Sequence, residues 1–158
     1  MSTKDTQQSN SKPSKTDRSF IIKQVFIKKS TLVVDKSPFE LKAEWKPDAA
    51  MQLNVTTKSI DDSHQLIDLI IDINVKIEES PVFTCAVIQS GIFEMSGYTD
   101  EQNSQLRNSF CPNILFPYAR QLISQLTSQA GFPPLIIAPV DFEGRYQQLQ
   151  QAAKDKIN

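Results

Sequence analysis

The chain has 158 residues, 39% of them hydrophobic and 22% charged, which fits one soluble domain with a core of its own. Its 17 Lys and Arg nearly balance its 18 Asp and Glu, and so nearly neutral a charge does not argue for nucleic acid as the main partner, because phosphate binding needs a clustered positive field. We expect a cytoplasmic protein, because the chain shows no apolar run of membrane-spanning length, no secretory signal at its start and only two cysteines.

The amino-terminal residues predict a tail followed by a first strand. Residues 1–18 are polar except for Met1, and such a stretch cannot offset its ordering entropy, so we predict a disordered tail. A folded domain is expected over residues 19–152, with a flexible end at 153–158. Within it, the segment from Phe20 to Lys29 is apolar on both faces, which predicts a strand that is buried or lies at an interface.

Alternating apolar and polar residues predict the rest of a sheet. The alternation over 39–46 predicts a half-buried strand that ends at Pro47, and it resumes over 51–55. It is clearest over 67–78, where Ile70 is the one apolar residue on the polar side. Another strand follows over 82–95 after a short turn, so these two long strands predict an antiparallel hairpin.

Helical spacing replaces the alternation after Gly97. Apolar residues at 115, 119, 122 and 126 predict a helix that stops at Gly131, and Pro117 is expected to kink its first turn or to delay its start. A short second helix is predicted from Phe142 onward, with Asp141 as its cap. Because the strands come first and the helices last, we predict an α+β fold: a four-stranded antiparallel sheet with two C-terminal helices.

Two short helices cannot cover both faces of such a sheet. The first strand is also apolar on both sides, so we expect the sheet to bury surface against another copy of the chain.

Residues that could carry catalysis are sparse. The four glycines are too far apart to form a phosphate-binding loop, and neither a cofactor nor a metal site is predicted. His64 lies in a polar segment and is expected to be solvated. Cys85 and Cys111 are expected to pack in the core, although the spacing leaves open a cysteine-dependent enzyme. Replacing either cysteine with serine would then abolish activity.

Aromatic residues are the unusual feature that remains, with nine Phe, three Tyr and one Trp. Several lie near turns or the ends of elements, where they could line a groove for extended apolar peptide. The candidate lining residues are Trp45, Phe83, Phe93, Phe132, Phe142 and Tyr146.

Two segments carry a resemblance to a known family. CPNILFPYAR at 111–120 and GFPPLIIAPVDF at 131–142 closely resemble the signature region of SecB, the bacterial protein-export chaperone. EWKPD around Trp45 and QSGIF at 89–93 agree with it. The resemblance runs from about Phe20 to Leu149.

The resemblance implies both a fold and a function. SecB protomers form a homotetramer, a dimer of dimers in which helices lie between two eight-stranded sheets. Family members are cytoplasmic chaperones that hold unfolded preproteins without ATP and deliver them to the export ATPase SecA. The resemblance therefore implies a holdase rather than an enzyme. The alternative is a chaperone of the same fold dedicated to a narrow client, such as an antitoxin, with altered or absent SecA docking.

One surface departs from the family pattern. In SecB proteins, acidic residues on the sheet, with an apolar neighbour, dock a basic zinc-binding tail of SecA. The matching positions here hold Lys29, Val33, Thr84 and Ala86. None is acidic, so three hypotheses stay open: Asp35, Glu40 or Glu94 substitutes, SecA recognition differs, or another carrier receives the client.

Overall fold

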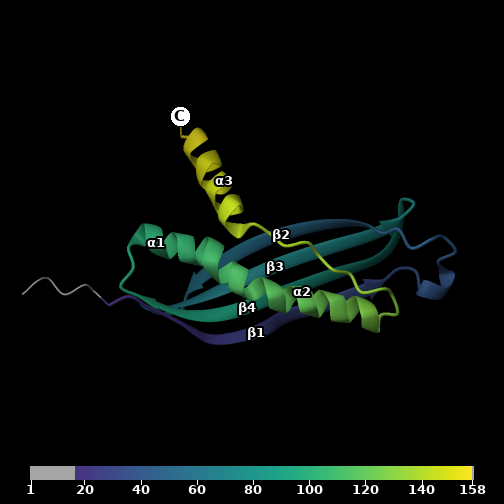
Figure 1. The fold of residues 1–158 in the computed structure, drawn as a ribbon, viewed down its shortest axis with the longest axis horizontal. Helices are drawn as coiled ribbons and strands as arrows, with labels where there is room; N and C mark the ends of the chain where they lie inside the picture. The colour runs from purple at the N-terminus through teal and green to yellow at the C-terminus, as the bar shows by residue number, and fades with distance from the viewer. Residues whose placement is uncertain (1–16, 158) are drawn as a thin grey trace, which may run out of the picture.

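A computed structural model describes residues 17–157 of the chain. The predicted tail therefore lies outside the described residues, except for Asp17 and Arg18. The chain forms four strands: β1 (Ser19–Val34), β2 (Asp48–Ser59), β3 (His64–Ile77) and β4 (Ser80–Ser96). They make one antiparallel sheet in the order β1-β4-β3-β2 (Figure 1), which confirms the predicted fold class.

The predicted hairpin is present between β3 and β4. Its turn is only two residues long, because Ile77 pairs with Ser80. Glu78 and Glu79 form the turn with φ of 49° and 64°, the left-handed conformation that two-residue hairpin turns require.

The predicted strand over 39–46 is wrong. The structure has a single 3-10 turn, η1 (Pro38–Glu40), followed by irregular chain up to β2. The backbone N–H and the hydroxyl of Ser37 both donate to the Glu40 carboxylate at 2.7 Å, and Pro38 sets the first dihedral angle of the turn. The alternation of apolar and polar residues over 39–46 therefore does not indicate a strand, because the hydrogen bonds between Ser37 and Glu40 turn the chain at the point where the strand would begin.

The first predicted helix is longer than its apolar spacing indicated. Helical chain begins at α1 (Asp100–Gln105), passes through a π-helical segment, η2 (Leu106–Phe110), and continues as α2 (Cys111–Gln129). Thr99 caps the start, since its hydroxyl accepts from the Gln102 N–H at 3.2 Å while the Gln102 side chain accepts from the Thr99 N–H at 3.0 Å. Pro117 lies inside α2 and does not delay the start of the helix.

The second predicted helix is confirmed as α3 (Phe142–Asp155). The Asp141 carboxylate caps it by accepting from the Gly144 N–H at 3.0 Å. α3 projects away from the sheet (Figure 1), and beyond its buried first turn Leu149 is 54% exposed. In the part of the chain that the structure describes, no helix is long and apolar enough to cross a membrane.

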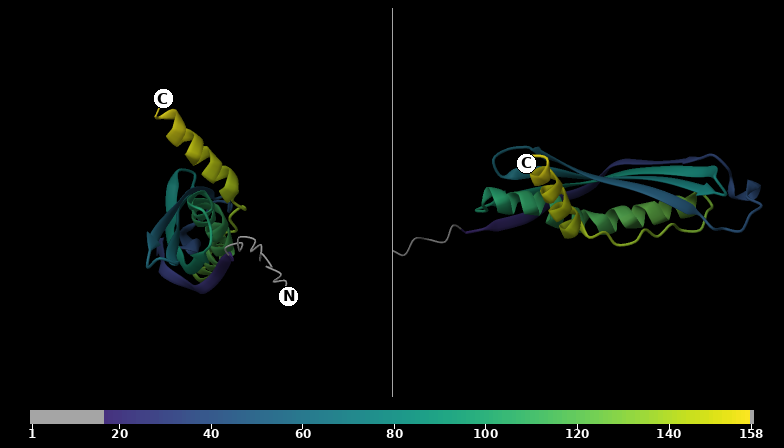
Figure 2. Two further views of the ribbon diagram at one scale, coloured as in Figure 1. Left: turned by 90° about the vertical axis from the view of Figure 1, so that its left-hand side faces the viewer. Right: turned by 90° about the horizontal axis from the view of Figure 1, so that it is seen from above.

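α2 lies along one face of the sheet (Figure 2) and encloses the core. The inward side chains of β3, at alternate positions from Ile67 to Ile77, are all buried. They pack with Leu115, Ala119 and Ile123 of α2. No helix within residues 17–157 covers the opposite face, which we call the outer face.

Candidate functional site

Three of the predicted groove residues meet at one end of the sheet. The ring centroids of Trp45 and Phe132 lie 5.5 Å apart in a stacked arrangement, and those of Phe83 and Phe132 lie 4.9 Å apart. Phe83 and Phe132 are buried, whereas Trp45 is half-buried. Trp45 is therefore the member of this stack that a bound peptide can reach without rearrangement.

Two exposed apolar side chains lie in the segments that border this stack. Phe39, in η1, is 96% exposed, and Ile136, in the extended segment between α2 and α3, is 66% exposed. The two segments approach each other, because a Cβ added to Gly131 would lie 3.2 Å from Pro38 Cγ. Phe39, next to Pro38, therefore lies near the segment that carries Phe132 of the stack.

The other three predicted groove residues lie elsewhere. Phe93 is buried against Phe20, with 5.7 Å between ring centroids. Phe142 is buried against Phe116, also at 5.7 Å, and Tyr146 is hydrogen-bonded to Ser104 at 2.7 Å. The six aromatic residues therefore occupy three separate places in the fold.

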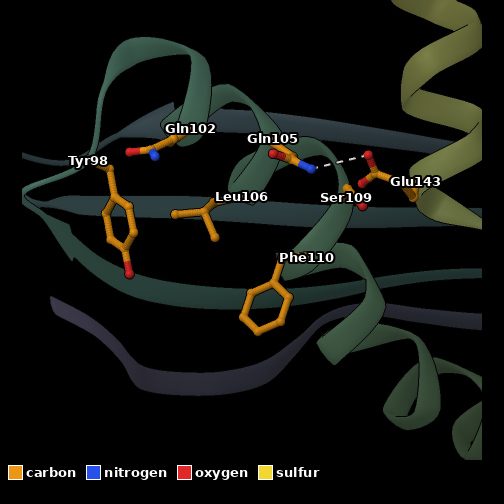
Figure 3. Close-up of a pocket in the computed structure, with 7 residues that line it drawn as sticks. All are labelled: Tyr98, Gln102, Gln105, Leu106, Ser109, Phe110 and Glu143. Atoms are coloured by element: carbon orange, nitrogen blue, oxygen red, sulfur yellow. Dashed lines mark hydrogen bonds between the residues drawn. The ribbon is translucent and has the colours of Figure 1, made fainter. Parts of the chain in front are cut away.

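A cavity of about 300 Å³ lies where α1 and η2 meet the first turn of α3 (Figure 3). Its lining is mostly apolar, with Tyr98, Leu106 and Phe110 on one side. At its edge the Gln105 amide donates to the Glu143 carboxylate at 3.1 Å. Hydrogen bonds from Ser109 and Gln105 lower the pKa of Glu143. The Glu143 carboxylate, which links α3 to α1 at the edge of the cavity, therefore stays ionised at neutral pH.

The four residues at which the family resemblance leads us to expect SecA docking all lie on the outer face. Val33 of β1 pairs with Thr84 of β4, and Ala86 is two residues further along β4. Lys29 pairs with Ile88, beyond Ala86 in the direction away from the β3–β4 turn. Lys29, Val33 and Thr84 are exposed and Ala86 is half-buried, so the four form one continuous surface.

Three acidic residues were candidates to replace the missing acidic residues of this surface, and two of them, Glu94 and Glu40, already interact with neighbouring side chains. Glu94 Oε2 lies 3.2 Å from Lys23 Nζ and 3.5 Å from His64 Nε2. Glu40 accepts both hydrogen bonds from Ser37, which lower the pKa of its carboxyl. Asp35 is exposed just beyond the end of β1.

The two cysteines are poor nucleophiles. Burial raises the pKa of the Cys85 thiol to about 11, with a further contribution from the Asp72 carboxylate. Burial raises the pKa of Cys111 to about 12. Both side chains stay protonated at neutral pH, and the reactive form of cysteine is the thiolate.

Sequence reasoning missed two features of these surfaces. It placed Phe39 in a strand, although the Ser-Pro-x-Glu pattern of residues 37–40 is itself a turn signal. It also missed a buried polar group on the outer face, where Asp68 accepts from Lys28 at 2.7 Å and from Ser90 at 2.6 Å. Only the sheet register brings those three strands together.

Comparison with known proteins identifies close relatives. The family model described as "Preprotein translocase subunit SecB" matches residues 13–153. The chain is 33% identical over 140 residues to a protein-export protein SecB of Methylococcus capsulatus, covering 89% of this chain and 90% of the relative. It is 39% identical over 137 residues to that of Idiomarina loihiensis, covering 85% and 82%.

Among solved structures, a SecB-like chaperone of Mycobacterium tuberculosis, in complex with a peptide from an antitoxin, superposes with a TM-score of 0.66. The match covers 77% of this chain and 90% of the other at 16% identity, so it supports the fold alone. The family match and the relatives go further, because they extend over most of the described chain at 33–39% identity. The chain therefore belongs to the SecB family of protein-export proteins.

Proposed function

We propose that this protein is an ATP-independent export chaperone, which binds unfolded precursor proteins in the cytoplasm, keeps them competent for translocation and delivers them to SecA. The observation that carries the proposal is the SecB match over residues 13–153. The function needs no reactive group, which agrees with cysteines held in their protonated form.

The physical basis of holding is mass action. A protein that binds the unfolded chain and not the native one lowers the concentration of free unfolded chain, and so slows the appearance of native protein. Slow-folding precursors are caught and fast-folding ones escape. Each buried apolar Å² contributes only about 25 cal/mol, so tight binding without sequence selectivity needs a long apolar surface.

Within one chain, we assign the start of that surface to Phe39, Trp45 and Ile136. These side chains are exposed or half-buried, whereas Phe83, Phe93, Phe132 and Phe142 are buried. The buried rings support the accessible ones: Phe132 stacks directly on Trp45. Tyr146 fixes the base of α3 through Ser104 and contributes indirectly.

Assembly would lengthen the surface. We propose a homotetramer, a dimer of dimers, because β1 is an edge strand with five apolar side chains that are 41–59% exposed in the single chain: Ile21, Ile22, Ile27, Val33 and Val34. Several grooves on one tetramer would bind one extended client at once, which multiplies the apparent affinity.

The test is the refolding of a slow-folding secretory precursor from denaturant, without ATP, followed by the fluorescence of the native state. We expect stoichiometric protein to arrest refolding. Phe39→Ala should weaken client binding about tenfold, because burying a Phe side chain contributes roughly 1.5–3 kcal/mol. The fold should be unaffected, since this ring is 96% exposed.

Ile60→Ala is the matched control, because Ile60 is 52% exposed at the opposite end of the sheet, in the β2–β3 turn. If both variants bound client with equal affinity, Phe39 would not be part of the client-binding surface. Normal refolding of many different precursors in the presence of intact protein would reject the general holdase and favour a chaperone for one narrow client.

A further inference from the structure

The cavity of about 300 Å³ beside α1 and η2 is not part of the surfaces assigned above. Its wall is apolar and partly open to solvent, since Phe110, which lines it, is 47% exposed. Binding pockets in proteins commonly enclose about 300–1,000 Å³, so this one suits a short segment of chain. Its occupant can be inferred from the charge at its edge and from the chain that begins beside it.

A carboxylate at the edge of the cavity lacks a positively charged partner. Glu143 accepts hydrogen bonds from the neutral amides of Gln105 at 3.1 Å and Gln147 at 3.3 Å. None of the ion pairs within residues 17–157 includes it. A second carboxylate, Glu101, lines a smaller opening to which Glu143 also contributes. An ionised carboxylate can accept at about four positions, so Glu143 can still bind a cation.

The described chain begins beside this cavity. A Cβ added to Gly97 would lie 2.7 Å from the Asp17 carbonyl oxygen, and the residue after Gly97, Tyr98, lines the cavity. At the start of β1, Phe20 contacts Phe110 with 5.2 Å between ring centroids. The residues that precede Asp17 therefore join the fold next to the wall of the cavity.

The sequence before Asp17 has the chemistry to fill the cavity. Residues 1–16 contain three lysines and one aspartate, so their net charge is positive. Pro13 lies between Lys12 and Lys15, and the SecB family match begins at this proline. Four residues of extended chain span about 13 Å, which brings Pro13 within reach of the cavity. Proline also loses little entropy on binding, because its ring already fixes φ.

We propose that the amino-terminal segment of this chain at residues 12–16 occupies the cavity. The Pro13 ring packs against Phe110, and the Lys12 ammonium binds the Glu143 carboxylate. In this position the segment covers an apolar ring that is otherwise open to solvent. It also links the chain before β1 to the base of α3.

The direction of the segment follows from the shape of the cavity. Tyr98 and Glu143 lie on opposite sides of it, with Leu106 and Phe110 between them (Figure 3). A segment that passes Tyr98 first reaches the carboxylate last, which favours the lysine before the proline over the one after it. The interaction needs neither a client nor a carrier, so it stands independently of the proposed function.

The experiment places a nitroxide on the tail and measures how strongly it broadens methyl NMR signals of the full-length protein. Ser9→Cys accepts the label selectively, because both native cysteines are buried and protonated. Leu106 reports on the cavity. Ile21 is the reference, because it lies at the start of β1 and points to the outer face, whereas the preceding Phe20 packs on the core. We expect stronger broadening at Leu106 than at Ile21.

The charge and the shape of the segment are tested separately. Lys12→Gln should lower the ratio of bound to unbound segment about twofold to fivefold, the range of one exposed charge pair. Glu143→Gln should do the same, and combining the two should lower the ratio no further, because the charges act as one pair. Pro13→Ser should lower it up to about tenfold through the loss of buried CH₂ groups. Lys4→Gln is the matched control, because it removes the same charge outside the proposed segment.

Several results would overturn the proposal. Equal broadening of Leu106 and Ile21 would show that the tail does not bind in the cavity, and equal effects of Lys4→Gln and Lys12→Gln would remove the proposed ion pair. Oligomers reassembled from nitroxide-labelled copies and isotope-labelled copies test a second occupant. Broadening of Leu106 that passes only between copies would assign the cavity to the tail of a neighbouring chain.

An unfolded client is the remaining occupant to test. An unfolded precursor should shift the Leu106 signals more strongly in a variant that lacks residues 1–16 than in the full-length protein, because the tail competes for the cavity. Equally strong shifts in both proteins would assign the cavity to the client and reject the tail. Refolding of the same precursor, measured with both proteins, tests the holdase separately.

Discussion

Asp68 is a nearly buried carboxylate on a sheet face that no helix in the described chain covers. It is only 9% exposed, and it accepts from the Lys28 ammonium and the Ser90 hydroxyl, which come from two other strands. Lys28 lies in a register shift between Ile27 and Lys29, and the extra residue lets its side chain reach across β4. The Asp68 carboxylate of β3 therefore links its own strand to β1 through Lys28 and to β4 through Ser90.

Replacing Asp68 with Ala should therefore destabilise the fold by about 1–3 kcal/mol, because Ser90 stays buried without its acceptor and Lys28 loses its counter-ion. Chemical denaturation would measure the loss. Asp72→Ala, on the same strand and face but exposed, should change stability by no more than about 0.5 kcal/mol. Equal effects of the two substitutions would show that the buried network contributes nothing.

The β3–β4 hairpin is formed through an unfavourable turn. Glu78 and Glu79 both adopt positive φ, which side chains with a Cβ disfavour, and they also place two negative charges side by side. The apolar alternation of the two strands fixes their pairing strongly enough to impose this geometry.

The pair Asn-Gly suits such a turn, so the double substitution Glu78→Asn, Glu79→Gly should raise stability by about 1 kcal/mol. A shift of the urea midpoint to higher concentration would show it. Ser59→Gly, at the end of β2, is a control for simply adding a glycine to the same sheet and should not stabilise. A lower midpoint for the double variant would mean that the turn is not strained.

At the scale of the whole molecule, the two edges of the sheet differ. On β2, the Arg145 guanidinium of α3 donates to the Leu53 carbonyl oxygen at 3.0 Å, so part of this edge is already occupied. On β1, exposed apolar side chains occur from Ile21 to Val34. An exposed apolar edge strand favours pairing with another chain.

We expect Ile27→Lys to shift the assembly toward smaller species, because Ile27 is 52% exposed on β1 and a charge there would have to be buried in an interface. Light scattering after size-exclusion chromatography would measure the mass. Thr57→Lys, exposed on β2, should leave the mass unchanged. The interface would have to lie elsewhere if the β2 variant dissociated and the β1 variant did not.

The sequence by itself determined the α+β class, the β3–β4 hairpin, both helices and the family, because alternation, helical spacing and a signature motif are local along the chain. Tertiary structure decided what each surface presents. Phe39 is exposed because the Ser37–Glu40 turn takes the place of the predicted strand. Five of the six groove candidates are buried, because Phe83, Phe93, Phe132 and Phe142 belong to the hydrophobic core and Tyr146 is hydrogen-bonded to Ser104. Asp72 stands beside Ala86 only through cross-strand register. Such proximity depends on pairing between residues distant in sequence, which no local pattern encodes.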